Sequence, residues 1–402
     1  MKRRRVKITG IGPVTPAGIG REEFWKGILE PVSRIRAYTK LDEGDGPMVA
    51  ASVDRFSLSR YVDRARVSNG IGRHSQFAAA GAILALQDAN LNPSELSGPE
   101  TLVITGSSLM DFGGISNSTR AVFSKGPRAA IPRTIFTTTN ANVTETIAGV
   151  LGFVPRTMTL QNSCCAGLDA VGFAAAAVAR GEANIAICGG TEAPLHRCPL
   201  LELRAAGLTP PTVEMSDRLA RPFDLWRTTG VVSEGACMFV LEPENSPRIG
   251  YCFVSGYGFA NDLPGEICSG LIEASRSALA DAGRRISEIE TLSAWGPGHQ
   301  LIDLGEASAM EKVFGPSLSQ IASYSIKGSI GSALGAAPAI QIAAAALTQR
   351  FGVLPPTVNW LRADPACPLN LSSRMRIVEP RLTLINAHGV GSVNSCMVID
   401  RC

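Results

Sequence analysis

Short strand-like runs alternate with longer alanine-rich segments along this chain. Thr157–Leu160 and Ile185–Cys188 are short, and each is followed by a turn or a glycine pair. Between them, Leu168–Arg180 has the length and alanine content of a helix, and Gly181 ends it. Strands that alternate with helices predict the α/β class.

The chain opens with a further strand-like run, Val6–Thr9, which leads into Gly10-Ile11-Gly12-Pro13. These glycines do not continue into the spacing of a dinucleotide-binding fingerprint. We therefore predict a tight turn under a helix at this point, rather than a nucleotide site.

An internal repeat lies in two segments that match without a gap. The first contains Ala85, Leu86, Asp88, Ala89, Ser94 and Glu95, and the second contains Ala278, Leu279, Asp281, Ala282, Ser287 and Glu288. Each segment predicts a helix, then a turn, then a strand that meets a glycine. Two such units predict duplicated α/β halves, at residues 1–247 and 248–402, with the boundary in the turn-rich stretch Pro243–Pro247.

Composition narrows the class of protein without identifying a function. The 402 residues are 45% hydrophobic and 18% charged, which allows a sizeable core and excludes a disordered chain. The net charge of +3 does not favour a nucleic-acid partner. The ten cysteines and four histidines lack zinc-like spacing, so we expect no metal, no disulfide framework and a cytoplasmic location. The longest uncharged stretch, Gly328–Gln349, contains Pro338 and Gln341 and predicts a buried helix rather than a membrane span.

A cysteine pair stands in the turn between the predicted strand and helix. The turn is Gln161-Asn162-Ser163-Cys164-Cys165-Ala166-Gly167. A thiol there meets the positive end of a helix and free N–H groups, which stabilise a thiolate. The same N–H groups can stabilise an oxyanion. This segment alone leaves two interpretations open: a nucleophilic cysteine, or a buried turn with two inert cysteines.

Several motifs together give the chain a family resemblance. They are Thr9-Gly10-Ile11-Gly12-Pro13-Val14-Thr15-Pro16, the cysteine turn, Gly189-Gly190-Thr191-Glu192, Arg221-Pro222-Phe223-Asp224, Ser233-Glu234-Gly235-Ala236, Asp303-Leu304-Gly305-Glu306-Ala307, Lys327 to Gly335, and Gly352-Val353-Leu354-Pro355-Pro356-Thr357. Over nearly its full length the chain resembles a β-ketoacyl synthase of the thiolase superfamily. The resemblance implies a five-layer αβαβα sandwich of two similar halves, usually dimeric, that elongates acyl chains on carrier proteins without a cofactor.

The same resemblance assigns roles to individual residues. It places the acyl-accepting nucleophile on Cys164 and retains Lys327, with Asp303 and Glu306 as supporting residues. The two histidines of the family are replaced, by Trp295 and by Ser332. An indole N–H or a hydroxyl cannot act as an imidazole acid or base near neutral pH. We therefore do not expect efficient decarboxylative condensation, whereas acyl transfer onto Cys164 stays chemically possible.

Two other histidines carry expectations of their own. His388 stands where the family has a phenylalanine gate, and two interpretations stay open for it: a base that pairs with Cys164, or a polar gate or satisfied core histidine. His299 is predicted to be a loop histidine that faces solvent.

Two functions follow as alternatives. One is a β-ketoacyl synthase-like acyltransferase that acts on chains bound to acyl carrier protein in type II fatty-acid or polyketide biosynthesis, as a homodimer or a heterodimer. The other is a non-catalytic subunit that resembles a chain length factor and pairs with an active ketosynthase. The short link Ala260-Asn261-Asp262-Leu263-Pro264-Gly265 favours the second, and the retained Cys164 favours the first.

Overall fold

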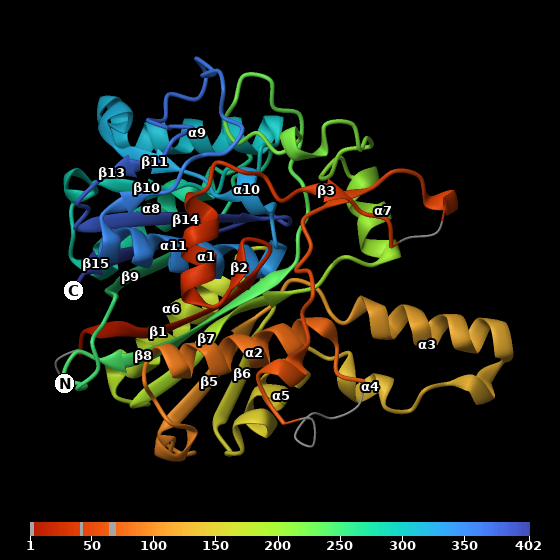
Figure 1. Ribbon diagram of the computed structural model, residues 1–402. Helices are drawn as coiled ribbons and strands as arrows, with labels where there is room; N and C mark the ends of the chain where they lie inside the picture. The colour runs from red at the N-terminus through yellow and green to blue at the C-terminus, as the bar shows by residue number, and fades with distance from the viewer. Residues whose placement is uncertain (1–3, 41–42, 64–69) are drawn as a thin grey trace.

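Two half-sheets with the same strand order build the centre of the molecule (Figure 1). The computed structural model describes residues 4–40, 43–63 and 70–402. The first half contains β1 (Val6–Thr15), β5 (Thr101–Gly106), β6 (Arg156–Leu160), β7 (Ile185–Glu192) and β8 (Gly235–Pro243). The second contains β9 (Cys252–Asn261), β10 (Thr291–Ser293), β11 (Ala322–Tyr324), β14 (Leu382–Gly389) and β15 (Val393–Arg401).

The pairing pattern confirms the predicted duplication. The order β6-β5-β7-β8-β1 in one half repeats as β11-β10-β14-β15-β9 in the other. In each half the second strand of this order, β5 or β10, pairs in parallel with both neighbours, and the remaining pairs are antiparallel. The half-sheets also join edge to edge, where Lys7 and Ile8 pair with Phe253 and Cys252. The predicted boundary after residue 247 falls in the connection between β8 and β9.

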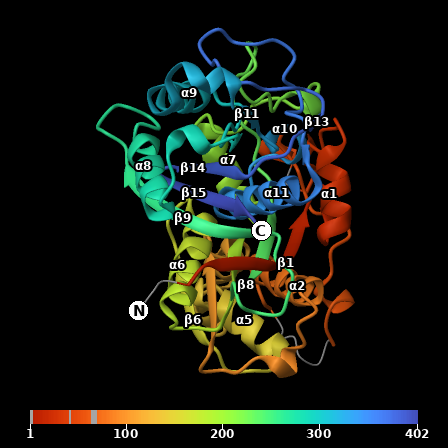
Figure 2. The same cartoon turned by 90° about the vertical axis from the view of Figure 1, so that its left-hand side faces the viewer.

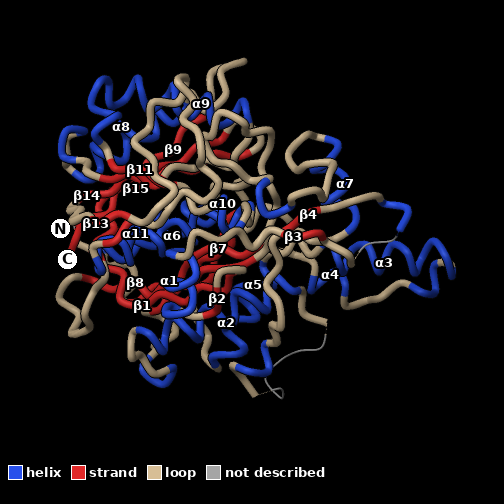
Figure 3. The backbone as a smooth tube through the Cα atoms, turned by 45° about the horizontal axis from the view of Figure 1, so that its top comes forward, coloured by secondary structure: helices blue, strands red, loops and turns tan. Residues whose placement is uncertain are grey.

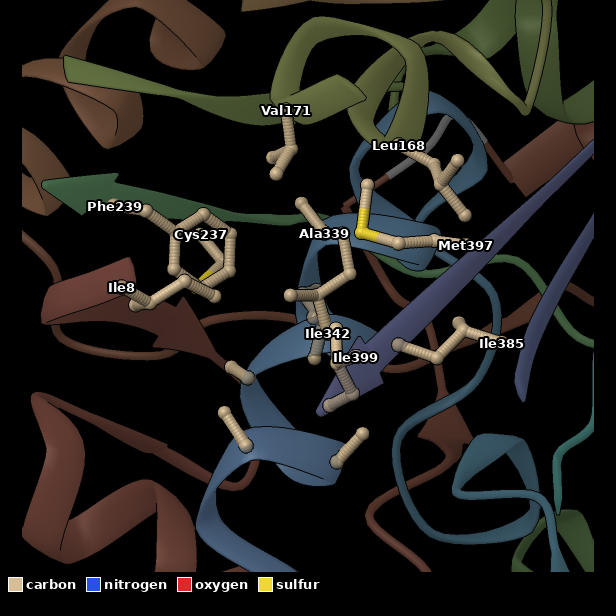
Figure 4. Packing of buried hydrophobic residues seen from close by; sticks show 14 of the residues in the cluster. Ile8, Leu168, Val171, Cys237, Phe239, Ala339, Ile342, Ile385, Met397 and Ile399 are labelled. Carbon is tan, nitrogen blue, oxygen red and sulfur yellow. The ribbon is translucent and has the colours of Figure 1, made fainter. Parts of the chain in front are cut away.

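Helices complete the five layers of a thiolase fold. Helices α6 (Ala166–Arg180) and α11 (Ala337–Phe351) lie between the half-sheets, α2 (Arg73–Asp88) and α5 (Ala141–Leu151) cover the first half, and α8 (Gly270–Ala282) and α9 (Gln300–Phe314) cover the second (Figures 1 and 2). In the middle layer, Leu168 and Val171 of α6 and Ile342 of α11 pack between Phe239 on one sheet and Met397 on the other (Figure 4). The predicted α/β class and layered architecture are therefore confirmed.

Short elements connect the layers. They are α1 (Arg21–Leu29), α3 (Phe112–Lys125), α4 (Thr134–Thr137), α7 (Arg197–Ala205), α10 (Lys327–Ile330), and the strands β2 (Gly18–Ile19), β3 (Arg36–Ala37), β4 (Val49–Ala50), β12 (Val353–Leu354) and β13 (Arg376–Ile377). Seen as a tube, α3 extends from the body as an arm (Figure 3). All 14 residues of α3 are at least partly exposed.

The predicted turn at Gly10-Ile11-Gly12-Pro13 is wrong, because β1 runs straight through it. A Cβ on Gly10 would lie 2.0 Å from the carbonyl oxygen of Ala85, and one on Gly12 would lie 1.9 Å from that of Gly81. The glycines therefore serve the close approach of α2 to the strand rather than a turn.

The second half uses the same device. A Cβ on Gly256 of β9 would lie 2.0 Å from the carbonyl oxygen of Ala278 in α8. The repeated aspartates also match: Asp88 accepts the Ile11 N–H at 2.9 Å, and Asp281 accepts the Tyr257 N–H at 3.1 Å. Each aspartate ties its outer helix to the first strand of its half.

The stretch Gly328–Gln349 forms a turn and a buried helix, as predicted. Residues Ala337–Gln349 of α11 are all buried. By length and composition alone, one described helical window, Ser163–Arg180, could cross a membrane, but 78% of it is buried inside the fold. It contains α6, a central core helix.

Candidate active site

The cysteine turn places Cys164 just before the central helix α6. Ser163 adopts a left-handed conformation with φ 47°, and α6 begins at Ala166. A Cβ on Gly106 would lie 2.0 Å from the Ala166 carbonyl oxygen, and one on Gly167 would lie 2.5 Å from the Gly335 carbonyl oxygen. Small residues therefore let the turn sit between β5 and the loop before α11.

The two cysteines have different surroundings. Cys165 is fully buried, its Sγ lies 3.5 Å from the Val393 carbonyl oxygen, and burial raises its pKa well above the usual value. Cys164 is 8% exposed and lines a cavity. Cys164 is therefore the one positioned to meet a substrate.

The Cys164 thiol is protonated near neutral pH. Burial raises its pKa to about 11, although the Ser163 hydroxyl and the Val390 N–H donate to the sulfur and the distant Lys327 charge also favours the thiolate. This differs from the expectation of a thiolate stabilised by the helix start, because desolvation outweighs those contributions. The thiol needs a base to become a nucleophile.

A small cavity brings the predicted positions together. Its volume is about 80 Å³, and its lining includes Cys164, Trp295, Ser332 and His388. The rest of the lining is mostly apolar, with Leu203, Leu208, Val231, Val232, Ile302 and Leu334. Trp295 and Ser332, the residues that the resemblance places at the family's histidine positions, therefore line the same cavity as Cys164.

Lys327 lies behind Trp295. Its ammonium nitrogen is 3.7 Å from the centroid of the Trp295 ring, and it donates to the Trp295 carbonyl oxygen and, at 2.8 Å, to Gln341 Oε1. Lys327 is buried and is not part of the cavity lining. Burial lowers its pKa, against the opposing influence of Glu306 and Asp303. Trp295 therefore separates the lysine from the cavity.

Glu306 and Asp303 hold the loop that carries Trp295. Glu306 accepts the N–H groups of Trp295 and Gly296, each at 2.8 Å. Asp303 accepts the Gly298 N–H at 3.1 Å and the Phe223 N–H at 2.7 Å, and burial raises its pKa to about 7. Both carboxylates act on the backbone of the site and not directly on the cavity.

His388 lies at the end of β14, beside the cysteine turn. The backbone of Gly389 is close enough to the turn that a Cβ there would lie 3.0 Å from the Cys164 nitrogen. His388 Nδ1 lies 2.9 Å from Asn394 Oδ1, and Asp262 Oδ2 lies 3.9 Å from the same nitrogen. Among the described residues, no direct hydrogen bond joins the ring to the Cys164 sulfur.

His299 lies in the loop before α9, as predicted, but it is only partly exposed to solvent. It lines the cavity and caps α9, because its Nδ1 accepts the N–H groups of Leu301 at 3.2 Å and Ile302 at 3.4 Å. Burial lowers its pKa. A capping acceptor just before a helical run was the sequence signal that the solvent-facing prediction overlooked.

Three further residues of the site were not predicted for it: Gln341, Asn394 and Asp262. Gln341 accepts from Lys327, and its amide nitrogen donates to the Ala294 carbonyl oxygen at 3.1 Å. Over the described ranges 4–40, 43–63 and 70–402, the structure groups no three His, Cys, Asp or Glu side chains as metal ligands.

Comparison with known proteins identifies the class. The duplicated layers and the cysteine at the start of a central helix define a thiolase-fold protein. Family models for the N-terminal and C-terminal domains of β-ketoacyl synthases match residues 3–246 and 251–360. The chain belongs to the β-ketoacyl synthase family.

The relatives span fatty-acid and polyketide systems. Polyketide β-ketoacyl synthase 1 of Streptomyces virginiae is 30% identical, over 99% of this chain and 98% of the relative. 3-Oxoacyl-[acyl-carrier-protein] synthase 2 of Coxiella burnetii is 27% identical, over 100% and 99%. Among solved structures, the ishigamide ketosynthase/chain length factor is 29% identical with a TM-score of 0.92. A type II polyketide ketosynthase in complex with its acyl-carrier protein is 26% identical with a TM-score of 0.90, and both alignments cover both chains in full.

Proposed function

We propose that this protein accepts an acyl chain on Cys164 from an acyl carrier protein. One observation carries the proposal: Cys164 and His388 line the same small cavity, together with Trp295 and Ser332. A thiol, a neighbouring imidazole and an apolar lining suit acyl transfer.

The transfer needs no outside reagent. The Cys164 thiol gives its proton to His388, directly or through a water molecule, and the sulfur attacks the carbonyl carbon of the carrier-bound thioester. The carbon–sulfur bond to the carrier breaks, and the departing thiolate takes the proton back. A new thioester on Cys164 replaces the old one, so atoms and charges balance.

The usual condensation does not follow from this site. Loss of one donor to a developing oxyanion costs about 10²–10³ in rate, and both family positions are changed here. Trp295 also covers Lys327. We therefore propose that decarboxylative condensation, where it occurs, takes place on a partner.

The partners we propose are acyl carrier protein and a second ketosynthase-family chain, in the cytoplasm. The structure of a ketosynthase in complex with its acyl-carrier protein supports the first, since this chain aligns with it over its full length. The second ketosynthase-family chain is supported by two features of the surface. β6 is the last strand in its half-sheet, and α3 and α4 carry exposed apolar residues.

The same surface favours a second candidate, a non-catalytic subunit that resembles a chain length factor. The solved ishigamide ketosynthase/chain length factor is 29% identical to this chain. In that role Trp295 and Ser332 occupy a site that catalyses no reaction, and Cys164 accepts no acyl group.

Intact-mass measurement after incubation with acyl-carrier protein separates the two functions. The acyltransferase predicts a mass increase equal to the acyl group, absent from Cys164→Ala and retained in Cys165→Ala. The neighbouring Cys165 is the matched control, because it is buried away from the cavity. An unmodified protein after incubation with several acyl lengths contradicts the acyltransferase and favours the subunit.

A further inference from the structure

The base beside Cys164 has a fixed support on the neighbouring strand. His388 on β14 and Asn394 on β15 are direct partners in the antiparallel register. Their side chains meet with 2.9 Å between Nδ1 and Oδ1. Both residues are buried, His388 at 8% exposure and Asn394 at 1%.

The orientation of the Asn394 amide is determined by its other contacts. Its nitrogen donates to Asp262 Oδ1 at 2.7 Å, and it also lies near the carbonyl oxygens of Ser392, at 3.4 Å, and Ala260, at 3.5 Å. Three oxygens around one end identify that end as the NH₂ group. The end that faces His388 is therefore the carbonyl oxygen, which can only accept.

An acceptor at Nδ1 decides where the histidine carries its proton. Nδ1 must be protonated to donate to Asn394, so in the neutral ring Nε2 holds the lone pair. The described residues provide no hydrogen-bond partner for Nε2, while the ring contributes to the lining of the Cys164 cavity. Most buried side-chain nitrogens have a hydrogen-bond partner, so an unbonded Nε2 on a ring that lines the cavity is available to accept a proton.

We infer that Asn394, anchored by Asp262, is a positioning residue that holds His388 in the Nδ1–H tautomer with Nε2 free to act as base toward Cys164. The role of His388 as a base rests on the proposed acyl transfer. The position of Asn394 beside His388 follows from the strand pairing alone. Hydrogen bonds join His388 to Asn394 and Asn394 to Asp262, although the three residues are spread over positions 262–394 of the sequence.

Asp262 contributes charge as well as orientation. Its Oδ1 also accepts the Gly270 N–H at 2.9 Å, which fixes the carboxylate, and its Oδ2 lies 3.9 Å from His388 Nδ1. When Nε2 takes the Cys164 proton, the imidazolium forms beside this carboxylate.

Nitrogen-15 NMR of the full-length protein labelled in histidine tests the tautomer directly. The chain has four histidines, and His388→Gln identifies the signal of interest. We expect His388 to show a protonated Nδ1 and an unprotonated Nε2 in the parent protein. Asn394→Leu should produce a mixture of tautomers, and the exposed-site control Asn184→Leu should leave the parent signal unchanged. A parent protein with its proton on Nε2 overturns the inference.

Rates of Cys164 acylation, followed by intact mass, provide the second measurement. Asn394→Leu should slow acylation about 10²-fold, the scale of a general base. Asp262→Asn keeps an oxygen for the Asn394 amide but removes the charge, so the tautomer should persist while acylation slows. Loss of the tautomer in Asp262→Asn contradicts the role assigned to the Asn394 amide.

The two measurements separate this inference from the proposed function. A parent protein with the expected tautomer, shifted by Asn394→Leu, supports the positioning role even when no acyl adduct forms, and then only the acyl transfer fails. An adduct that forms at the parent rate in Asn394→Leu overturns the positioning role and leaves the acyl transfer intact.

Discussion

At the scale of single residues, the site is organised around a buried neutral thiol rather than a preformed thiolate. Burial raises the pKa of Cys164 to about 11, so the start of α6 does not by itself activate the sulfur. Activation then depends on a base in the cavity, and His388 is held beside the cysteine turn by strand pairing.

Trp295 gives a prediction about stability at the same scale. The ring is buried and lies over the Lys327 ammonium at 3.7 Å. Trp295→Ala should lower the free energy of unfolding by about 3–5 kcal/mol, since it removes a large buried side chain and uncovers a buried charge. Trp295→Phe keeps a ring above the lysine and should lose about 1–2 kcal/mol. Urea unfolding measures both, and equal losses in the two variants would contradict a packing role for the ring.

At the scale of elements, close approach between a strand and its outer helix decides where glycine is needed. Gly10→Ala would place a Cβ 2.0 Å from the Ala85 carbonyl oxygen, so we expect a loss of at least about 3 kcal/mol. Gly149→Ala in α5 is the matched control, because a Cβ there meets no atom within 4 Å. The control should leave stability unchanged or raise it by up to about 1 kcal/mol, since alanine favours a helix. Thermal unfolding compares the two, and similar melting temperatures would contradict the close helix–strand contact.

The same glycines show what a sequence can and cannot predict for this fold. Periodicity, alanine content and the repeat predict the α/β class and the duplication, because those signals are local or recur. Gly10 and Gly12 mimic a turn locally, but their reason is a backbone from α2, which only the folded chain brings there. Contacts between segments far apart in the sequence therefore decide the role of these glycines, and the local sequence pattern does not show those contacts.

The candidate site, like the fold, could be predicted only in part from the sequence. The cysteine turn and the positions of Trp295 and Ser332 follow from motifs with fixed spacing. The partner of His388 does not, because Asn394 becomes its neighbour only when β14 and β15 pair. A hairpin prediction across Val390-Gly391-Ser392 would have placed the two residues opposite each other.

At the scale of the whole molecule, the first half-sheet ends in a strand whose outer edge pairs with no other described strand. β6 ends its half-sheet, and Met158 on it is half exposed. The α3–α4 arm beside it carries Phe123, Ile135 and Phe136, all largely exposed. An apolar arm and an open sheet edge on the same half fit a surface that is covered by a second chain.

Oligomeric state tests that interpretation. Phe136 is 70% exposed in the single chain, and Phe136→Asp places a charge in the proposed interface, so we expect the mass in solution to fall from that of a pair to that of one chain. Ile377→Asp is the matched control, because Ile377 is 91% exposed but lies on β13, in the second half. Size-exclusion chromatography with light scattering, on this chain alone and on this chain co-expressed with a ketosynthase, distinguishes self-pairing from mixed pairing. A single-chain mass for the parent protein in both samples would contradict the proposed interface. Because acylation of Cys164 is measured separately, a paired but unacylated protein would identify the interface as the function that this chain retains.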